Sequence, residues 1–222
     1  MKQIGLFGGT FNPIHRGHLW AAKQVRETYG LDSVILIPSA IPPHKHPNGI
    51  RPAPQRLDMI RRAAAGQSGL TVSDIELARV GPSYTIDTVR HYISQTAGRA
   101  KLFLIVGLDA FLEMDTWRSY RQLFQLISLI VLDRPGSVDR PEGDIFETVL
   151  KFLKSRISDE YAPTPDPSVF KHGAHPSVHV CSRTMLDVSS TRIRELVKRG
   201  ENIDALVPET VDEYIRHKGI YR

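Results

Sequence analysis

The stretch "GLFGGTFNPIHRGHL" at positions 5–19 decides the fold, because a buried strand predicted at 3–8 turns there into a helix predicted at 18–30. After an apolar opening it carries three glycines, a proline and two histidines. In open parallel sheets, ligands bind outside the carboxyl ends of the strands. The stretch is therefore expected to form both the first turn of a sheet and the edge of a binding site.

Apolar runs alternate with helical patterns along the following part of the chain. Buried strands are predicted at 33–38 and 101–107, a further strand at 70–77, and a strand that runs into a turn at 127–136. Helical patterns lie at 52–66 and 83–98, with shorter ones around Trp117. Strands that are apolar throughout and alternate with helices indicate a parallel sheet covered on both faces. We expect an α/β fold, a Rossmann-like doubly wound parallel sheet with helices on both faces and a small C-terminal helical part.

The length of 222 residues favours a single domain over 1–222, with a less regular elaboration at about 137–176. Within that elaboration, 142–156 is predicted to be helical and 161–176 to be a proline-rich loop. A short strand near 177–181 and helices at 189–200 and 208–219 complete the predicted order of elements.

The charge balance points to an anionic partner. Lys and Arg number 29 and Asp and Glu 24, which gives a net charge of +5. Such a surface suits phosphate-bearing small molecules or nucleic acid. Because the basic residues are scattered and form no long run, nucleic acid is the weaker candidate, and we expect no nucleic-acid partner.

Cysteine content and apolar run lengths exclude several classes of protein. Cys181 is the only cysteine, so an internal disulfide and a cysteine-based metal site are excluded. The longest apolar runs, such as 102–106, are too short to span a bilayer, and the N-terminus does not resemble a signal peptide. A cytoplasmic protein without a membrane partner is expected, and a homo-oligomer is left open.

The glycines and histidines of the opening stretch favour phosphate binding. Gly8 and Gly9 let the backbone approach a ligand and adopt conformations closed to other residues, and N–H groups there can cradle anionic oxygens. His15 and His18 are three residues apart, so they share one side near a helix start. The pattern is neither a G-x-G-x-x-G fingerprint nor a P-loop. A plain turn, structural histidines and a zinc site are the alternatives, and the zinc site lacks a matching third ligand.

Two segments near opposite ends of the chain resemble the signatures of the nucleotidyltransferase superfamily with the H-x-G-H motif, "GGTFNPIHRGHL" (8–19) and "VSSTRIR" (188–194). Further segments narrow the resemblance to bacterial nicotinate-nucleotide adenylyltransferases: "IPPHK" (41–45), "PSYTIDTV" (82–89), "VGLDAFLEMDTWRSY" (106–120) and "DRPG" (133–136). The resemblance runs from Lys2 to the closing "GIYR" and is thinnest at 137–176. Asn12 stands where many members carry aspartate. Both residues suit turns, so little effect on the chemistry is expected.

The resemblance implies that ATP and nicotinate mononucleotide are the substrates, joined into deamido-NAD with release of pyrophosphate. It implies catalytic roles for His15 and His18 on the ATP phosphates and for Arg194 on the departing pyrophosphate. The attacking phosphate is already an anion, so catalysis should rest on positioning and charge neutralisation. The other implied ATP-binding residues are Gly8, Gly9, Thr10, Phe11, Asp109, Ser189, Ser190 and Thr191. For Asp109 the resemblance implies contact with the ribose hydroxyls. The alternative for Asp109, and for the serines at 189 and 190, is an ordinary role as a helix N-cap.

The resemblance also implies a mononucleotide site. In it, Trp117 stacks on the pyridine ring and the backbone N–H of Thr85 meets the nicotinate carboxylate. Core packing is the alternative for Trp117 and Tyr84. The full implied set is His44, Lys45, Tyr84, Thr85, Trp117 and Arg134. Mg²⁺ is expected as the cofactor, held mainly through ATP and pyrophosphate oxygens, with no metal site built from side chains.

Two other functions stay open on the sequence. The same chemistry could use nicotinamide mononucleotide or pantetheine phosphate as the acceptor. A non-enzymatic nucleotide sensor or nucleic-acid binder is favoured by the net charge and by basic clusters at 198–200 and 215–219. Such a binder predicts salt-sensitive binding to polynucleotides, but it does not explain two histidines beside a glycine turn.

Overall fold

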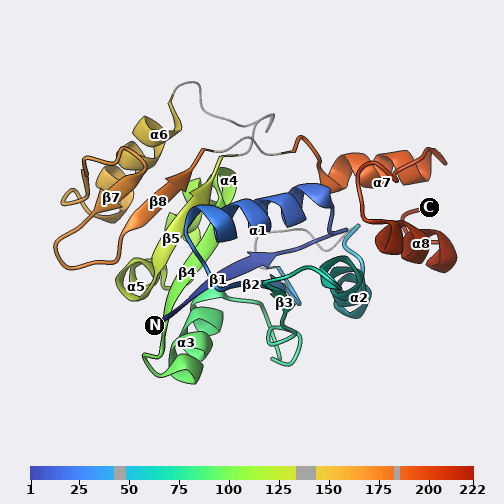
Figure 1. Ribbon diagram of the computed structural model, residues 1–222, viewed down its shortest axis with the longest axis horizontal. Helices are drawn as coiled ribbons and strands as arrows, with labels where there is room; N and C mark the ends of the chain where they lie inside the picture. The colour runs from blue at the N-terminus through green and yellow to red at the C-terminus, as the bar shows by residue number, and fades with distance from the viewer. Residues whose placement is uncertain (43–48, 134–143, 183–185) are drawn as a thin grey trace.

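A computed structural model describes residues 1–42, 49–133, 144–182 and 186–222. Among these residues an eight-stranded sheet forms the centre of the protein (Figure 1). Six strands are parallel, in the order β3 (Leu70–Val72), β2 (Ser33–Pro38), β1 (Lys2–Gly9), β4 (Ala100–Gly107), β5 (Ser128–Leu132) and β8 (Val178–Cys181). Two short antiparallel strands, β7 (Val169–Lys171) and β6 (Ala162–Pro163), extend the sheet beyond β8.

Helices cover both faces of the sheet, because successive strand residues point to opposite sides. Phe7 and Ile105 belong to one buried apolar cluster, and Leu6 and Leu104 to the other. Helices α1 (Arg16–Thr28), α2 (Ala53–Ala64), α7 (Ser190–Lys198) and α8 (Glu209–Lys218) contribute to the first cluster. The second cluster takes side chains from α3 (Thr85–Thr96), α4 (Leu108–Leu112), η1 (Met114–Thr116), α5 (Tyr120–Leu126), α6 (Ile145–Phe152) and η2 (Leu153–Ile157). The predicted α/β fold with a doubly wound sheet is confirmed.

Two predicted segments differ from the structure. The stretch 161–176, predicted as a loop, contributes β6 and β7, so that prediction is wrong. Phe170 is buried and pairs with Val178 of β8, and this pairing depends on tertiary packing that a local pattern does not contain. Pro163 is compatible with β6, because an edge strand can lack a backbone donor. Of the strand predicted over 70–77, only Leu70–Val72 forms β3, and the rest contains a turn that the N–H of Leu77 closes onto the carbonyl of Asp74 (2.8 Å).

The C-terminal helices lie beside helices from the N-terminal half of the chain (Figure 1). At the start of α1, the N–H of Arg16 donates to the carbonyl oxygen of Leu206 (2.9 Å). On α8, the Tyr214 hydroxyl donates to the Asp58 carboxylate of α2 (3.3 Å). These contacts hold the C-terminal part next to the carboxyl ends of the strands. Within the described ranges, no helix is long and apolar enough to cross a membrane.

Candidate functional site

A cleft of about 470 Å³ lies at the carboxyl ends of β1 and β4. Segments from opposite ends of the chain meet in it. The sequence assigned eleven residues to ATP, and every one of them lines this cleft: Gly8, Gly9, Thr10, Phe11, His15, His18, Asp109, Ser189, Ser190, Thr191 and Arg194. Among the described lining residues, Asp109 is the only acidic side chain, whereas Arg194 and two imidazoles are potential cations or donors. The cleft is therefore suited to an anionic ligand.

The two histidines form a stacked pair at the start of α1. His15 is the N-cap residue and its side chain is 2% exposed. The imidazole centroids of His15 and His18 lie 3.7 Å apart, with 28° between the rings, and the Phe11 ring meets His18 edge-on at 4.9 Å. The N–H of His15 donates to Nδ1 of His18 (3.3 Å). A neutral His18 that accepts at Nδ1 carries its proton on Nε2, where it can donate to a ligand.

Close packing, rather than an unusual backbone angle, requires a glycine at position 9. Neither Gly8 nor Gly9 has a positive φ, so the expected special conformation is absent at both. A Cβ on Gly9 would lie 2.9 Å from the Phe11 ring, whereas one on Gly8 would meet nothing within 4 Å. The left-handed conformation falls instead on Phe11, with φ of 47°. Gly9 is therefore needed to let Phe11 fold back toward His18.

Helix α7 is fixed onto the N-terminal motif by direct hydrogen bonds. The Ser189 side chain caps the helix by accepting from the N–H of Arg192 (3.2 Å), so the N-cap interpretation is confirmed for this serine. The Ser190 hydroxyl donates to the carbonyl oxygen of Pro13 (2.8 Å). Arg194 donates through Nη1 to the carbonyl oxygen of Asn12 (2.9 Å) and through Nη2 to the Thr191 hydroxyl (3.2 Å). The helix N-terminus and the histidine pair consequently line one cleft.

Asp109 lies just after β4, in the first turn of the short helix α4. The N-cap of that helix is Gly107, so the N-capping alternative for Asp109 is wrong. The Asp109 carboxylate reaches back over the preceding turn, because a Cβ on Gly107 would lie only 2.5 Å from Oδ1. Glycine at 107 thus makes room for a carboxylate at the rim of the cleft.

Asn12 links two other parts of the chain, residues 49–51 and the C-terminal end, to the cleft. It is 5% exposed. Its Nδ2 donates to the carbonyl oxygen of Gly49 (2.9 Å), and its Oδ1 accepts from the N–H of Arg51 (3.1 Å) and from the Tyr221 hydroxyl (2.8 Å). Burial raises the pKa of Tyr221, which keeps that hydroxyl a donor. The side chain therefore uses both its donor and its acceptor, and an aspartate could supply only the acceptor.

We expect Asn12→Asp to lower the free energy of unfolding by about 1–3 kcal/mol, because the Gly49 carbonyl loses its donor in a buried setting. Gly49 lines the cleft to which the resemblance assigns ATP, so we expect KM for ATP to rise several-fold. Chemical denaturation and initial-rate kinetics measure the two effects. Asn202→Asp, at an exposed position outside the cleft, is the matched control. If Asn12→Asp and wild type have the same free energy of unfolding and the same KM for ATP, the sequence-based expectation of little effect is correct.

A second cavity of about 210 Å³ adjoins the first. Both cavities are lined by Gly8, Gly9 and Thr10, so the end of β1 forms their shared wall. The smaller cavity contains three residues that the sequence assigned to the mononucleotide: Tyr84, Thr85 and Trp117. Tyr84 is the N-cap of α3 and Thr85 its first residue. The other assigned residues, His44, Lys45 and Arg134, lie outside the described residues.

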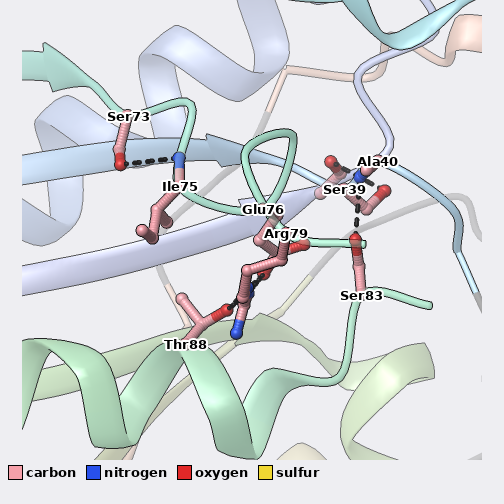
Figure 2. A network of polar contacts seen from close by, with 9 residues as sticks. Ser39, Ala40, Ser73, Ile75, Glu76, Arg79, Ser83 and Thr88 are labelled. Carbon is pink, nitrogen blue, oxygen red and sulfur yellow. Dashed lines mark hydrogen bonds and ion pairs between the residues drawn. The ribbon is translucent and has the colours of Figure 1, made fainter. Parts of the chain in front are cut away.

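A polar network on the wall of the smaller cavity was missed by the sequence analysis (Figure 2). Glu76 is 7% exposed and lines the cavity. It accepts a hydrogen bond from the Thr88 hydroxyl (2.6 Å) and lies 3.7 Å from Arg79, which also bonds Thr88. Ser83 accepts from the N–H of Ala40 (2.8 Å). Ser83 and Thr88 fall inside the quoted segment 82–89, which was the available signal.

Arg56, on α2, braces the backbone around both cavities. It is fully buried, and it donates to the carbonyl oxygens of Thr10 (2.7 Å), Ser39 (2.7 Å), Ala40 (3.2 Å) and Arg51 (2.8 Å). Burial lowers its pKa. The guanidinium thereby ties the chain after β1 to the chain after β2. An arginine on the apolar side of a predicted helix was the sequence signal that could have revealed it.

The described residues contain no group of three or more His, Cys, Asp or Glu side chains arranged to hold a metal ion. A divalent cation that enters with a triphosphate needs no such group, because phosphate oxygens and water can supply its hard oxygen ligands. Asp109 is the carboxylate that lines the cleft. The donor set therefore suits a metal carried by the ligand.

Comparisons with known proteins show the family to which the chain belongs. A family model described as "Cytidylyltransferase-like" matches residues 6–196. Two curated relatives, from Desulfatibacillum aliphaticivorans and Pelobacter propionicus, are each 42% identical over 99% of this chain and 99% and 98% of their own lengths. Both bear the name "Probable nicotinate-nucleotide adenylyltransferase".

Solved structures share the fold at low sequence identity. Plasmodium falciparum nicotinic acid mononucleotide adenylyltransferase complexed with NaAD superposes with a TM-score of 0.73 at 15% identity, covering 100% of this chain and 98% of the other. The same enzyme complexed with APC gives a TM-score of 0.71 at 14% identity, with the same coverage. At these identities the likeness extends to the fold alone.

Proposed function

The chain belongs to the cytidylyltransferase-like family, and from that premise we propose that it is a nicotinate-nucleotide adenylyltransferase. It transfers the adenylyl group of ATP to nicotinate mononucleotide, giving deamido-NAD and pyrophosphate. The observation that carries this function is the pair of cavities that meet at Gly8, Gly9 and Thr10. One is lined by groups suited to phosphates and the other by aromatic side chains. Two nucleotides bound in them would bring their phosphates together at the end of β1.

We propose that ATP binds in the larger cleft, with its phosphates between the histidine pair and the start of α7. The first N–H groups of α7 and the positive end of its dipole favour the β- and γ-phosphates. His18 donates from Nε2 to the α-phosphate as negative charge develops there. Arg194 neutralises the departing pyrophosphate through its planar fork. The hydrogen bonds from Arg194 to Asn12 and Thr191 orient that fork beforehand.

The proposed acceptor, nicotinate mononucleotide, binds in the smaller cavity. Trp117 packs on the pyridine ring, and the N–H of Thr85 at the start of α3 meets the ring carboxylate. A phosphate oxygen of the mononucleotide then forms a bond to the α-phosphorus, and the bond from that phosphorus to the bridging β-oxygen breaks. No proton needs to be removed, because the nucleophile is already anionic. Positioning and charge neutralisation therefore supply the rate enhancement.

Nucleotidyltransferases of this kind use divalent metal ions, and we propose Mg²⁺ here, carried by the triphosphate and offsetting part of its charge. Asp109, the acidic residue among the described lining residues of the cleft, could assist, besides its proposed contact with ribose hydroxyls. The residues present fit this role, because the cleft combines one carboxylate with donors for the remaining phosphate oxygens.

A substrate panel tests the proposed function. The protein is mixed with Mg-ATP and, separately, nicotinate mononucleotide, nicotinamide mononucleotide or pantetheine phosphate, and pyrophosphate release is followed. We expect the highest kcat/KM with nicotinate mononucleotide and deamido-NAD as the product. Absence of pyrophosphate release with all three acceptors contradicts the enzyme class, and a strong preference for either other acceptor contradicts the substrate.

Trp117→Ala should weaken the mononucleotide and spare ATP. Trp117 is half-buried and lines the smaller cavity, so we expect it to contribute a stacking interaction of about 1–3 kcal/mol. KM for nicotinate mononucleotide should rise about tenfold, while KM for ATP should change less than twofold in the same kinetics. Trp20→Ala is the matched control, because Trp20 is exposed and lines neither cavity. Equal losses for both substrates would show that Trp117 acts through core packing.

A further inference from the structure

The acceptor choice depends on one functional group. Nicotinate and nicotinamide mononucleotides share their shape and differ by a carboxylate in place of a carboxamide. A site that distinguishes the two mononucleotides must therefore recognise the charge of this group, because their sizes are the same. A neutral N–H group can donate to an oxygen of either the carboxylate or the carboxamide, whereas a cation binds the carboxylate more strongly.

Arg118 is a cation in the smaller cavity. It lines that cavity together with Tyr84, Thr85 and Trp117. Its guanidinium carbon lies 4.6 Å from the centroid of the Tyr84 ring. Such stacking orients a guanidinium and leaves its in-plane N–H groups available for a carboxylate. Tyr84 is itself held at the start of α3, where its N–H donates to the carbonyl oxygen of Pro82 (3.1 Å).

The charge of Arg118 is not offset by any carboxylate of the described part of the chain. Among the described residues, no carboxylate lies within ion-pair distance of it. The acid that lines the same cavity, Glu76, is engaged on its other side by Thr88 and Arg79 (Figure 2). Neither Thr88 nor Arg79 lines the cavity. The network thus offsets the charge of Glu76 from outside, and Arg118 remains available to an incoming anion.

We infer that Arg118 sets the preference for the acid over the amide by pairing with the carboxylate of the nicotinate ring. This inference rests on the proposed function, because it names the residue that recognises the carboxylate of the proposed acceptor, nicotinate mononucleotide. The Thr85 N–H binds an oxygen of either group, and Arg118 adds the charge-dependent part. Tyr84 acts as the platform that keeps the guanidinium in place.

The test is the ratio of kcat/KM for nicotinate mononucleotide to kcat/KM for nicotinamide mononucleotide. In Arg118→Gln this ratio should fall tenfold or more, chiefly through a higher KM for the acid, with KM for ATP unchanged. Arg118→Lys keeps the positive charge but lacks the planar guanidinium, so its ratio should lie between those of wild type and Arg118→Gln. Arg121→Gln is the matched control, because Arg121 also lies over a tyrosine ring (5.4 Å from Tyr120) but lines neither cavity.

A ratio within twofold of wild type in both Arg118 variants contradicts the inference. Arg118 is exposed as a whole, so both variants should fold, and thermal unfolding checks this. Calorimetric titration with nicotinate mononucleotide alone gives a second readout, in which the Gln variant should bind the acid about tenfold more weakly. Failure of the proposed function looks different, because the wild-type protein would then turn over neither acceptor.

Discussion

We expect His18→Ala to lower kcat by about 10²–10³-fold, the range found when one donor to developing negative charge is removed. His18 lines the cleft that we propose for ATP, and its Nδ1 accepts from the His15 N–H, so a neutral ring carries its proton on Nε2. Alanine removes that donor and keeps the helix. The loss should appear in kcat more than in KM for ATP, because the interaction strengthens as the α-phosphate reacts.

Two further variants make the His18 result specific. His18→Gln places an amide N–H near the position of Nε2 and should recover part of the lost rate. His217→Ala removes an exposed histidine of α8 that lies outside the cleft and should leave the rate unchanged. Thermal unfolding of all three variants checks that the fold persists. A folded His18→Ala variant with wild-type kcat would contradict the proposed role of His18 as a donor to the α-phosphate.

Arg194→Ala is expected to lower kcat/KM for ATP by about 10²-fold, because a charge-assisted contact to a leaving phosphate group is lost in the transition state. The variant also loses the hydrogen bond to the Asn12 carbonyl, which joins α7 to the N-terminal motif. Arg194→Lys should recover only part of the activity, since one ammonium cannot bind phosphate and the Asn12 carbonyl in the same fork geometry. Steady-state kinetics with Mg-ATP measure the effect.

Arg192→Ala is the matched control for Arg194. Both arginines lie on α7, but Arg192 is exposed and does not line the cleft. The Arg192 variant should keep wild-type kcat/KM. If the two alanine variants lose activity equally, α7 contributes general positive charge and the specific role of Arg194 is wrong.

Much of the fold follows from local patterns, because the central strands are continuous apolar runs and their helices carry clear periodicity. β6 and β7 could not be predicted in this way. Phe170 and Val178 become a pair only when the sheet has formed, and the prolines around them indicate a loop when read alone. The one sequence feature that suggested burial there was Phe170, a large apolar residue inside a proline-rich stretch.

The sequence could supply the residues assigned to ATP because, apart from Asp109, they fall in two contiguous motifs. The residues that the sequence missed act across segments. Arg56 bonds four carbonyls contributed by three stretches of chain, and Arg118 meets Tyr84 only because the segment just after η1 and the start of α3 line the same cavity. No single-segment pattern contains such contacts. Asn12 illustrates the same limit, since its role depends on Gly49 and Tyr221.

The central claim is that the histidine pair and the start of α7 hold one triphosphate between them. A crystal structure with an ATP analogue that carries a methylene bridge between the α- and β-phosphorus tests it directly. We predict phosphate oxygens within hydrogen-bond distance of both His18 and the Ser189–Arg194 segment, with the α-phosphate at the end of β1. A triphosphate that contacts only one of these segments, or that lies outside the cleft, contradicts the account.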